Sequence, residues 1–110
     1  MNLAGAIIGH MIGDYLLQND YLANNKKVSS LVCFIHCLLW TLAVSVFSDC
    51  YYPSVIIWLF VSHFIIDRWG FVGWYMKCFG QTGFIKHMGP WAIVVVDNTF
   101  HLVTIWLAWA

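Results

Sequence analysis

Seven histidines and aspartates interrupt otherwise hydrophobic stretches of this chain. Six of them form pairs separated by four positions, namely His10 with Asp14, His63 with Asp67, and Asp97 with His101, and the seventh is His36. Residues four apart on an α-helix lie on the same face. Ionisable side chains are unfavourable in hydrocarbon when isolated, so within hydrophobic spans they mark candidate functional sites.

These residue types predict a divalent metal site. Neutral imidazoles and ionised carboxylates are natural metal ligands, and a bound cation offsets the cost of burying them. We expect zinc, with manganese and iron as alternatives, and either one or two ions. Two ions bridged by carboxylate fit the set, as does one ion whose histidines are oriented by aspartates. The candidate ligands are His10, Asp14, His36, His63, Asp67, Asp97 and His101.

Asp14, Asp67 and Asp97 are the candidate catalytic residues. A metal with an open coordination position lowers the pKa of bound water and makes hydroxide available for hydrolysis. The aspartates would ligate the metal, bridge two ions or act as a base. The leading hypothesis is a metal-dependent hydrolase acting on an amphiphilic substrate, or on one that arrives from the cytoplasm. Whether the chain is an enzyme stays open at this point.

Three alternatives to the hydrolase remain. Without a metal, the seven residues would form a hydrogen-bonded network that only holds helices together, or a proton relay. A proton or metal-ion translocator would use them as a path, but the outer half of each predicted span is apolar apart from hydroxyls such as Thr41, Ser45 and Thr104. A channel needs polar groups along its full length. A phage-type interaction protein would use the metal only to fold and would bind a host membrane protein.

The elements that position these residues are predicted to be hydrophobic helices. Of the 110 residues, 62% are hydrophobic and only 9% are charged, whereas soluble domains carry roughly 25% charged residues. Four stretches approach the roughly 20 apolar residues that span a bilayer, and they are 2–18, 28–47, 52–71 and 91–110. We therefore predict an all-α fold, a four-helix transmembrane bundle that forms a single integral membrane domain over residues 1–110.

The basic residues predict an orientation in the membrane. They all fall in or beside the first and third connections, at Lys26, Lys27, Arg68, Lys77 and Lys86. The positive-inside rule places these connections in the cytoplasm and both termini outside. Counted from the cytoplasmic ends, the seven polar residues then lie roughly 6–15 Å deep, so inward-facing polar faces would converge on one site. The third connection, residues 72–90, is expected to lie along the membrane interface.

A row of small residues and the overall charge indicate the partners. Gly5, Gly9 and Gly13 form a GxxxGxxxG row that predicts close packing against a neighbouring helix. The expected partners of the chain are the lipid bilayer and a second copy of itself, because so small a bundle with aromatic faces favours self-association. The formal net charge is zero, so no basic patch is expected to bind nucleic acid.

The polar motifs share their order with those of a known family. The stretch from His10 to Gln18, followed by Lys26 or Lys27, resembles the opening motif of the DUF3307 family of small bacterial and phage membrane proteins. The later motifs of the chain fit the same pattern over nearly its whole length. The resemblance implies a multi-pass protein of the bacterial inner membrane and no particular reaction. The pattern is more loosely similar to membrane-bound metal-dependent hydrolases. Asn98 stands where the family usually has glutamine.

Overall fold

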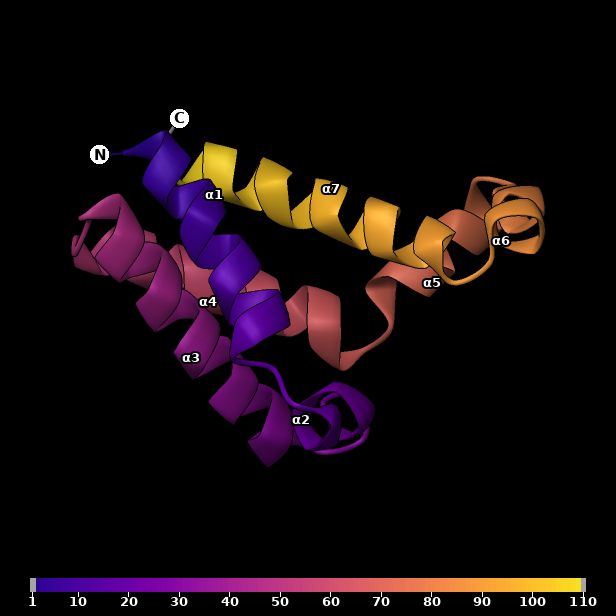
Figure 1. Ribbon diagram of the computed structural model, residues 1–110, viewed down its shortest axis with the longest axis horizontal. Helices are drawn as coiled ribbons and strands as arrows, with labels where there is room; N and C mark the ends of the chain where they lie inside the picture. Colours follow the sequence, from indigo (N-terminus) through magenta and orange to yellow (C-terminus); the bar gives the residue numbers. More distant parts are fainter. Residues whose placement is uncertain (1, 110) are drawn as a thin grey trace.

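The protein is built from helices joined by short turns. The computed structural model describes residues 2–109. The elements are α1 (Leu3–Met11), the π-helix η1 (Ile12–Leu16), α2 (Asp20–Asn25), α3 (Ser30–Ser48), α4 (Pro53–Arg68), α5 (Phe71–Cys78), α6 (Thr82–Met88) and α7 (Trp91–Ala108) (Figure 1). Residues 2–109 contain no β-strand, which confirms the prediction of an all-α fold.

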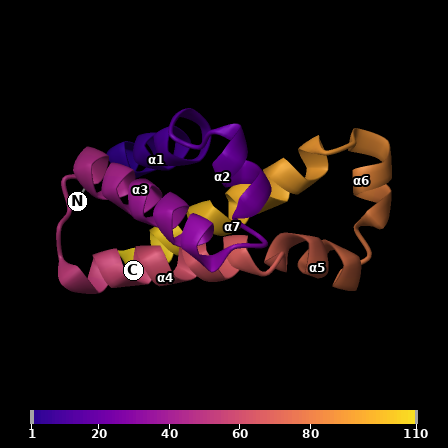
Figure 2. The same ribbon diagram turned by 90° about the horizontal axis from the view of Figure 1, so that it is seen from below.

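Four of these helices contact one another in a ring. α1 packs against α3, α3 against α4, α4 against α7, and α7 against α1. Both ends of the chain lie at one end of the ring (Figure 1), where the backbone N–H of Asn2 donates to the carbonyl of Ser48 over 3.1 Å. α5 and α6 lie at the opposite end of the molecule, as Figure 2 also shows.

Local sequence sets the ends of the helices. Asn2, Asn19 and Ser29 cap α1, α2 and α3, because each side chain accepts a hydrogen bond from the backbone N–H three residues later. Pro53 opens α4, at the position where its missing N–H costs no helical hydrogen bond. α3 ends at Ser48, and the next residue, Asp49, is left-handed with φ 54° and turns the chain back toward α4.

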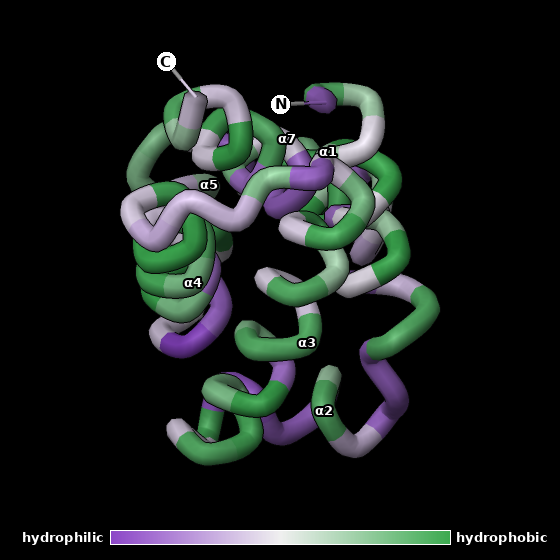
Figure 3. Tube along the Cα trace, turned by 90° about the vertical axis from the view of Figure 1, so that its left-hand side faces the viewer, coloured by the Kyte–Doolittle hydropathy of each residue, from purple (hydrophilic) through white to green (hydrophobic). Residues whose placement is uncertain are grey.

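Two helices, α3 and α7, are long and apolar enough to cross a membrane. α4 and α5 reach that length together, but they are bent by 66° where they meet. The segment Leu3–Leu16 is apolar but shorter. By length and composition, residues 2–109 therefore supply two spanning helices, or three if the bent pair is one span. Hydrophobic residues run along α3 and α4, whereas hydrophilic ones gather around α2 (Figure 3).

The third connection, which the sequence predicted to lie along the membrane interface, is largely helical. The third hydrophobic helix, predicted to reach residue 71, ends at Arg68, and Gly70 turns the chain with φ 64°. Glycine adopts this left-handed conformation without a steric penalty. Residues 72–90 then contain most of α5 and all of α6. Val72 and Met76, one helical turn apart, are buried against Ala92 of α7, and this contact orders α5.

Two apolar clusters lie on either side of the polar residues along the ring. The cluster nearer the chain ends consists of Ala6, Trp40, Val44, Cys50, Val55, Leu59 and Ile105. The second cluster consists of Ile66, Val72, Met76 and Ala92. On α4, for example, Leu59 of the first cluster and Ile66 of the second flank His63. The ring thus holds its polar side chains between two apolar layers.

The glycine row of α1 lies directly against α3, which confirms the predicted close packing. A Cβ atom at Gly5 would lie 1.9 Å from the carbonyl oxygen of Phe47, and one at Gly9 would lie 2.6 Å from that of Ala43. A Cβ at Gly13 would meet α3 at 2.7 Å. Neighbouring backbone atoms cannot move aside as a flexible side chain can, so only glycine allows this approach.

The substitution Gly9→Ala should therefore destabilise the protein by about 1–3 kcal/mol, as overpacking of a tight interface does. Unfolding of the detergent-solubilised protein by a denaturing detergent measures the change. Gly73→Ala in α5 is the matched control, because a Cβ there has no neighbour within 4 Å. Equal stability of Gly9→Ala and the wild type would contradict the close packing of α1 on α3.

Candidate metal centre

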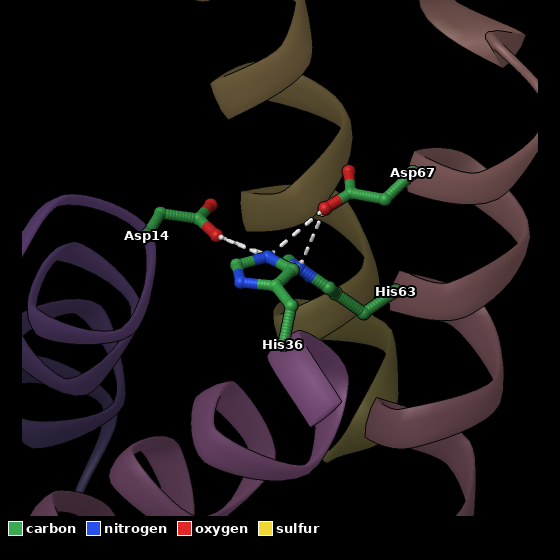
Figure 4. Close-up of side chains that lie close together, drawn as sticks. All are labelled: Asp14, His36, His63 and Asp67. Carbon is green, nitrogen blue, oxygen red and sulfur yellow. Dashed lines mark hydrogen bonds and ion pairs between the residues drawn. The ribbon is translucent and has the colours of Figure 1, made fainter. Parts of the chain in front are cut away.

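Three elements, η1 and the ring helices α3 and α4, bring four polar side chains to one point. Asp14 comes from η1, His36 from α3, and His63 and Asp67 from α4 (Figure 4). One ligand atom of each lies within 4.8 Å of the corresponding atoms of the others. Each of these residues is at most 6% exposed. The π-helical turn of η1, a feature frequent at functional sites, carries Asp14.

Five of the six distances between these atoms are close to those between the ligands of a tetrahedral metal ion. Nε2 of His36 lies 3.2 Å from Oδ1 of Asp14 and 3.1 Å from Oδ2 of Asp67. Nε2 of His63 lies 3.5 and 3.0 Å from the same two oxygens, and the two Nε2 atoms are 3.0 Å apart. Ligand atoms bound about 2.0–2.1 Å from a tetrahedral zinc lie about 3.3 Å from one another. The donor set therefore fits a single small cation at its centre.

Hydrogen bonds from the two imidazoles cannot satisfy all four of these ligand atoms. A neutral imidazole carries one N–H, yet each Nε2 faces two carboxylate oxygens and the other Nε2. If both nitrogens were protonated, two N–H groups would point at each other across 3.0 Å. If only one were protonated, the lone pair of the other would face two carboxylates. A central cation attracts all four ligand atoms at once.

A second candidate group adjoins the first. Asp97 and His101 of α7 each place a ligand atom near one from Asp14. Nε2 of His101 lies 3.4 Å from Oδ1 of Asp97 and 3.2 Å from Oδ1 of Asp67. Asp67 thus directs one oxygen to each group. The Asp97 side chain is 30% exposed, whereas that of His101 is fully buried.

Lys26 supplies a cation from outside the predicted spans. Its Nζ donates to Oδ2 of Asp67 over 3.1 Å and to Oε1 of Gln18 over 2.9 Å. Burial would lower the pKa of Lys26, but the carboxylates of Asp67 and Asp14 outweigh this effect and raise the pKa above its ordinary value. Lys26 therefore stays charged. If the imidazoles are neutral, Lys26 balances one of the three aspartate charges at the site. The remaining two negative charges equal the charge that one divalent cation would balance.

His10 lies beside the candidate metal centre, and both of its ring nitrogens form hydrogen bonds to other side chains. Nε1 of Trp40 donates to Nδ1 of His10 over 3.0 Å. Since an indole N–H only donates, Nδ1 is unprotonated, and the His10 proton sits on Nε2, which donates to Oδ1 of Asn98 over 2.8 Å. Asn98 donates in turn to the hydroxyl of Tyr15. Neither candidate ligand group includes His10, although its Nδ1 approaches Asp14 to 3.4 Å.

Aromatic contacts orient the imidazoles. The ring of His63 is nearly parallel to those of Trp40 and His101, with centroids 4.0 and 4.1 Å away. Within residues 2–109, Nδ1 of His36, His63 and His101 has no hydrogen-bond partner. Metal-ligating histidines usually donate this N–H to a carboxylate or carbonyl. Here ring stacking takes over part of that orienting role.

A cavity of about 190 Å³ opens beside the candidate metal centre, on the side away from the chain ends. Asp14, Asp67 and Asp97 reach its wall, and Gln18 and Lys26 line it as well. Near this end, Arg68 donates from Nε to the hydroxyl of Ser30 over 3.1 Å and from its guanidinium group to the carbonyl of Lys27. The two carboxylates that face the histidine pair thus also face a polar, basic opening.

The structure brings together all seven residues predicted from the sequence and adds three others. Trp40 lies one helical turn beyond His36 on α3, so the four-residue spacing could have indicated it. Tyr15 follows Asp14 directly and had no periodic signal. Lys26 reaches Asp67 across 41 positions of the chain, and helical periodicity cannot predict a contact between separate elements.

Trp40→Phe should destabilise the protein by about 1–3 kcal/mol, because it leaves the buried Nδ1 of His10 without its donor while keeping an aromatic ring against His63. Chemical unfolding in detergent measures the difference. Trp106→Phe is the control, since Trp106 is exposed on α7. If both variants unfold at the same denaturant concentration as the wild type, the inferred His10 tautomer is wrong.

A family model described as "Protein of unknown function (DUF3307)" matches residues 3–110 of the chain. The chain therefore belongs to this family, as the order of its motifs indicated. No curated protein and no solved structure matches the chain.

Proposed function

We propose that this DUF3307 protein is an integral membrane protein that binds a divalent metal and uses it for hydrolysis. The observation that carries the proposal is the geometry of Asp14, His36, His63 and Asp67, in which each histidine Nε2 lies 3.0–3.5 Å from the other Nε2 and from an oxygen of each aspartate. Zinc suits this mixed set of nitrogen and oxygen donors, and manganese or iron could also bind there.

In this proposal the four helices of the ring cross the bacterial inner membrane with both chain ends outside. The lengths of α3 and α7 support it, as does the position of Lys26, Lys27 and Arg68 near the end with the cavity. The segment Leu3–Leu16 is only about 21 Å long, given the helical rise. A bilayer core is roughly 30 Å thick, so this helix requires local thinning of the membrane.

Labelling of intact bacteria with a membrane-impermeant thiol reagent tests this orientation. With the native cysteines replaced, a cysteine introduced as Asp49→Cys should react, because it lies in the outer turn between α3 and α4. One introduced as Lys27→Cys should react only after the cells are opened. The reverse labelling pattern would show that the orientation is inverted, with the chain ends in the cytoplasm and the cavity facing outward.

The cavity supports a catalytic use of the metal. A divalent ion with an open coordination position lowers the pKa of bound water and so supplies hydroxide for hydrolysis. Asp97 lies partly exposed on the cavity wall and is placed to hold or move a proton. Lys26 and Gln18 offer contacts to a polar group. The proposed substrate is an amphiphile whose polar end enters the cavity from the cytoplasmic side.

A structural metal is the second candidate, and one observation favours it. Four protein ligands complete the coordination of a tetrahedral zinc, as in sites that only stabilise a fold. The ion would then clamp η1, α3 and α4 together, and the protein would act by binding a host membrane protein or a second copy of itself. Translocation is disfavoured, because apolar side chains that include Trp40, Leu59 and Ile105 fill the ring beyond the metal centre.

The metal itself is tested by elemental analysis of the purified protein. The wild type should retain at least one divalent ion per chain. His63→Ala and His36→Ala should each weaken metal binding by more than about 100-fold, because loss of an outer partner alone weakens it about 10–100-fold. His87→Ala is the matched control, since this histidine is exposed on α6. A wild type without stoichiometric metal would overturn both the hydrolase and the clamp.

Hydrolysis is tested with long-chain p-nitrophenyl esters and phosphodiesters in mixed micelles. Release of p-nitrophenol should require the metal and stop when a chelator removes it. Asp97→Asn should lower kcat by about 10²–10⁴-fold, the usual contribution of a proton-transferring group, whereas the exposed control Asp20→Asn should not. A metal-loaded protein that cleaves neither class of substrate would favour the clamp.

A further inference from the structure

We propose that the protein holds a second divalent ion beside the first, ligated by Asp97, His101 and Asp14, with Asp67 bridging the two ions. This inference rests on the proposed metal centre and deepens it. It changes the role of Asp97 from a base on the cavity wall to a metal ligand, and it places the ion that water or substrate can reach at the second group.

Asp67 already has the arrangement of a bridging carboxylate. Its Oδ2 lies 3.1 Å from Nε2 of His36 and 3.0 Å from Nε2 of His63. Its Oδ1 lies 3.2 Å from Nε2 of His101, on the side of the second group. A carboxylate that ligates one ion can accept a hydrogen bond through its other oxygen, but His101 here belongs, with Asp14 and Asp97, to the second candidate group. Each oxygen here faces a different set of candidate ligands.

Asp14 has ligand capacity that hydrogen bonds leave unused. It is 6% exposed and contributes to both candidate groups. Its Oδ1 accepts no hydrogen bond within residues 2–109. Its Oδ2 lies 3.4 Å from Nδ1 of His10, but that nitrogen already accepts the N–H of Trp40 and so cannot donate. A buried carboxylate that accepts no hydrogen bond is stabilised by a nearby cation.

The second group differs from the first in having one partly exposed member, Asp97. His101 is fully buried, and its Nε2 is spaced 3.2–3.4 Å from oxygens of Asp67 and Asp97, close to the separation of ligands on one ion. Asp97 reaches the cavity wall. With the bridging Asp67, each ion would have four protein ligands, and a catalytic zinc can expand to five-coordinate. The first group would then hold an enclosed ion, and the second an ion that can take a fifth ligand from the cavity.

The net charge of the site differs between one bound ion and two. One divalent ion together with Lys26 balances the three aspartates, whereas two ions leave an excess of two positive charges. Such an excess is unfavourable in hydrocarbon unless anions approach it. The cavity beside Asp97 is where hydroxide, phosphate or a carboxylate could enter. The second ion therefore predicts that the polar end of the substrate is an anion.

Manganese provides the test, with the full-length protein in detergent. We expect two Mn²⁺ ions per wild-type chain after dialysis, and an electron paramagnetic resonance spectrum typical of two exchange-coupled ions that share a carboxylate. Asp97→Ala and His101→Ala should each retain one ion with an uncoupled spectrum. The exposed controls Asp20→Asn and His87→Ala should retain two.

Each outcome separates this inference from the proposed function. One Mn²⁺ per wild-type chain, unchanged in Asp97→Ala, would overturn the second ion and leave the first in place. Two uncoupled ions would overturn the bridge through Asp67. No bound metal would overturn the proposed function as well. The wild-type spectrum decides between these results even if His101→Ala fails to fold.

Discussion

Two buried carboxylates, those of Asp14 and Asp67, face the same pair of imidazole nitrogens inside an apolar ring of helices. Carboxylates placed this way are costly unless a cation lies among them. Lys26 supplies one positive charge from the cavity side, and the donor geometry fits a metal ion for the rest. The packing of the surrounding helices brings these groups together and encloses them.

The glycine row is the first requirement of that arrangement. Gly5, Gly9 and Gly13 let α1 lie against the backbone of α3, and this contact brings η1, with Asp14, beside His36. Trp40 serves both sides of the interface, since it donates to His10 of α1 and stacks on His63 of α4. The apolar clusters above and below the polar level complete the enclosure. Packing and chemistry are therefore coupled in the same few residues.

Much of the site could be predicted from spacing alone. Each His–Asp pair at a separation of four does bring its two side chains together, at 3.4 Å for His10 and Asp14, 3.0 Å for His63 and Asp67, and 3.4 Å for Asp97 and His101. The prediction succeeds because helical periodicity is a local property. It fails for the contact of Lys26 with Asp67 and for the hydrogen bonds of His10, because these depend on how separate helices are rotated and offset. The depth and orientation in the membrane stay predictions.

The sequence by itself determined that the chain is helical, that four hydrophobic stretches carry the ionisable residues, and that each pair shares one helix face. Composition and the period of 3.6 residues per turn suffice for these conclusions. Only the tertiary structure decided how the seven residues divide. It assigned four to one compact donor set, placed Asp97 and His101 on its open side, and engaged His10 with Trp40 and Asn98. Such assignments turn on distances of a few ångströms between helices, which arise from the close packing of particular side chains.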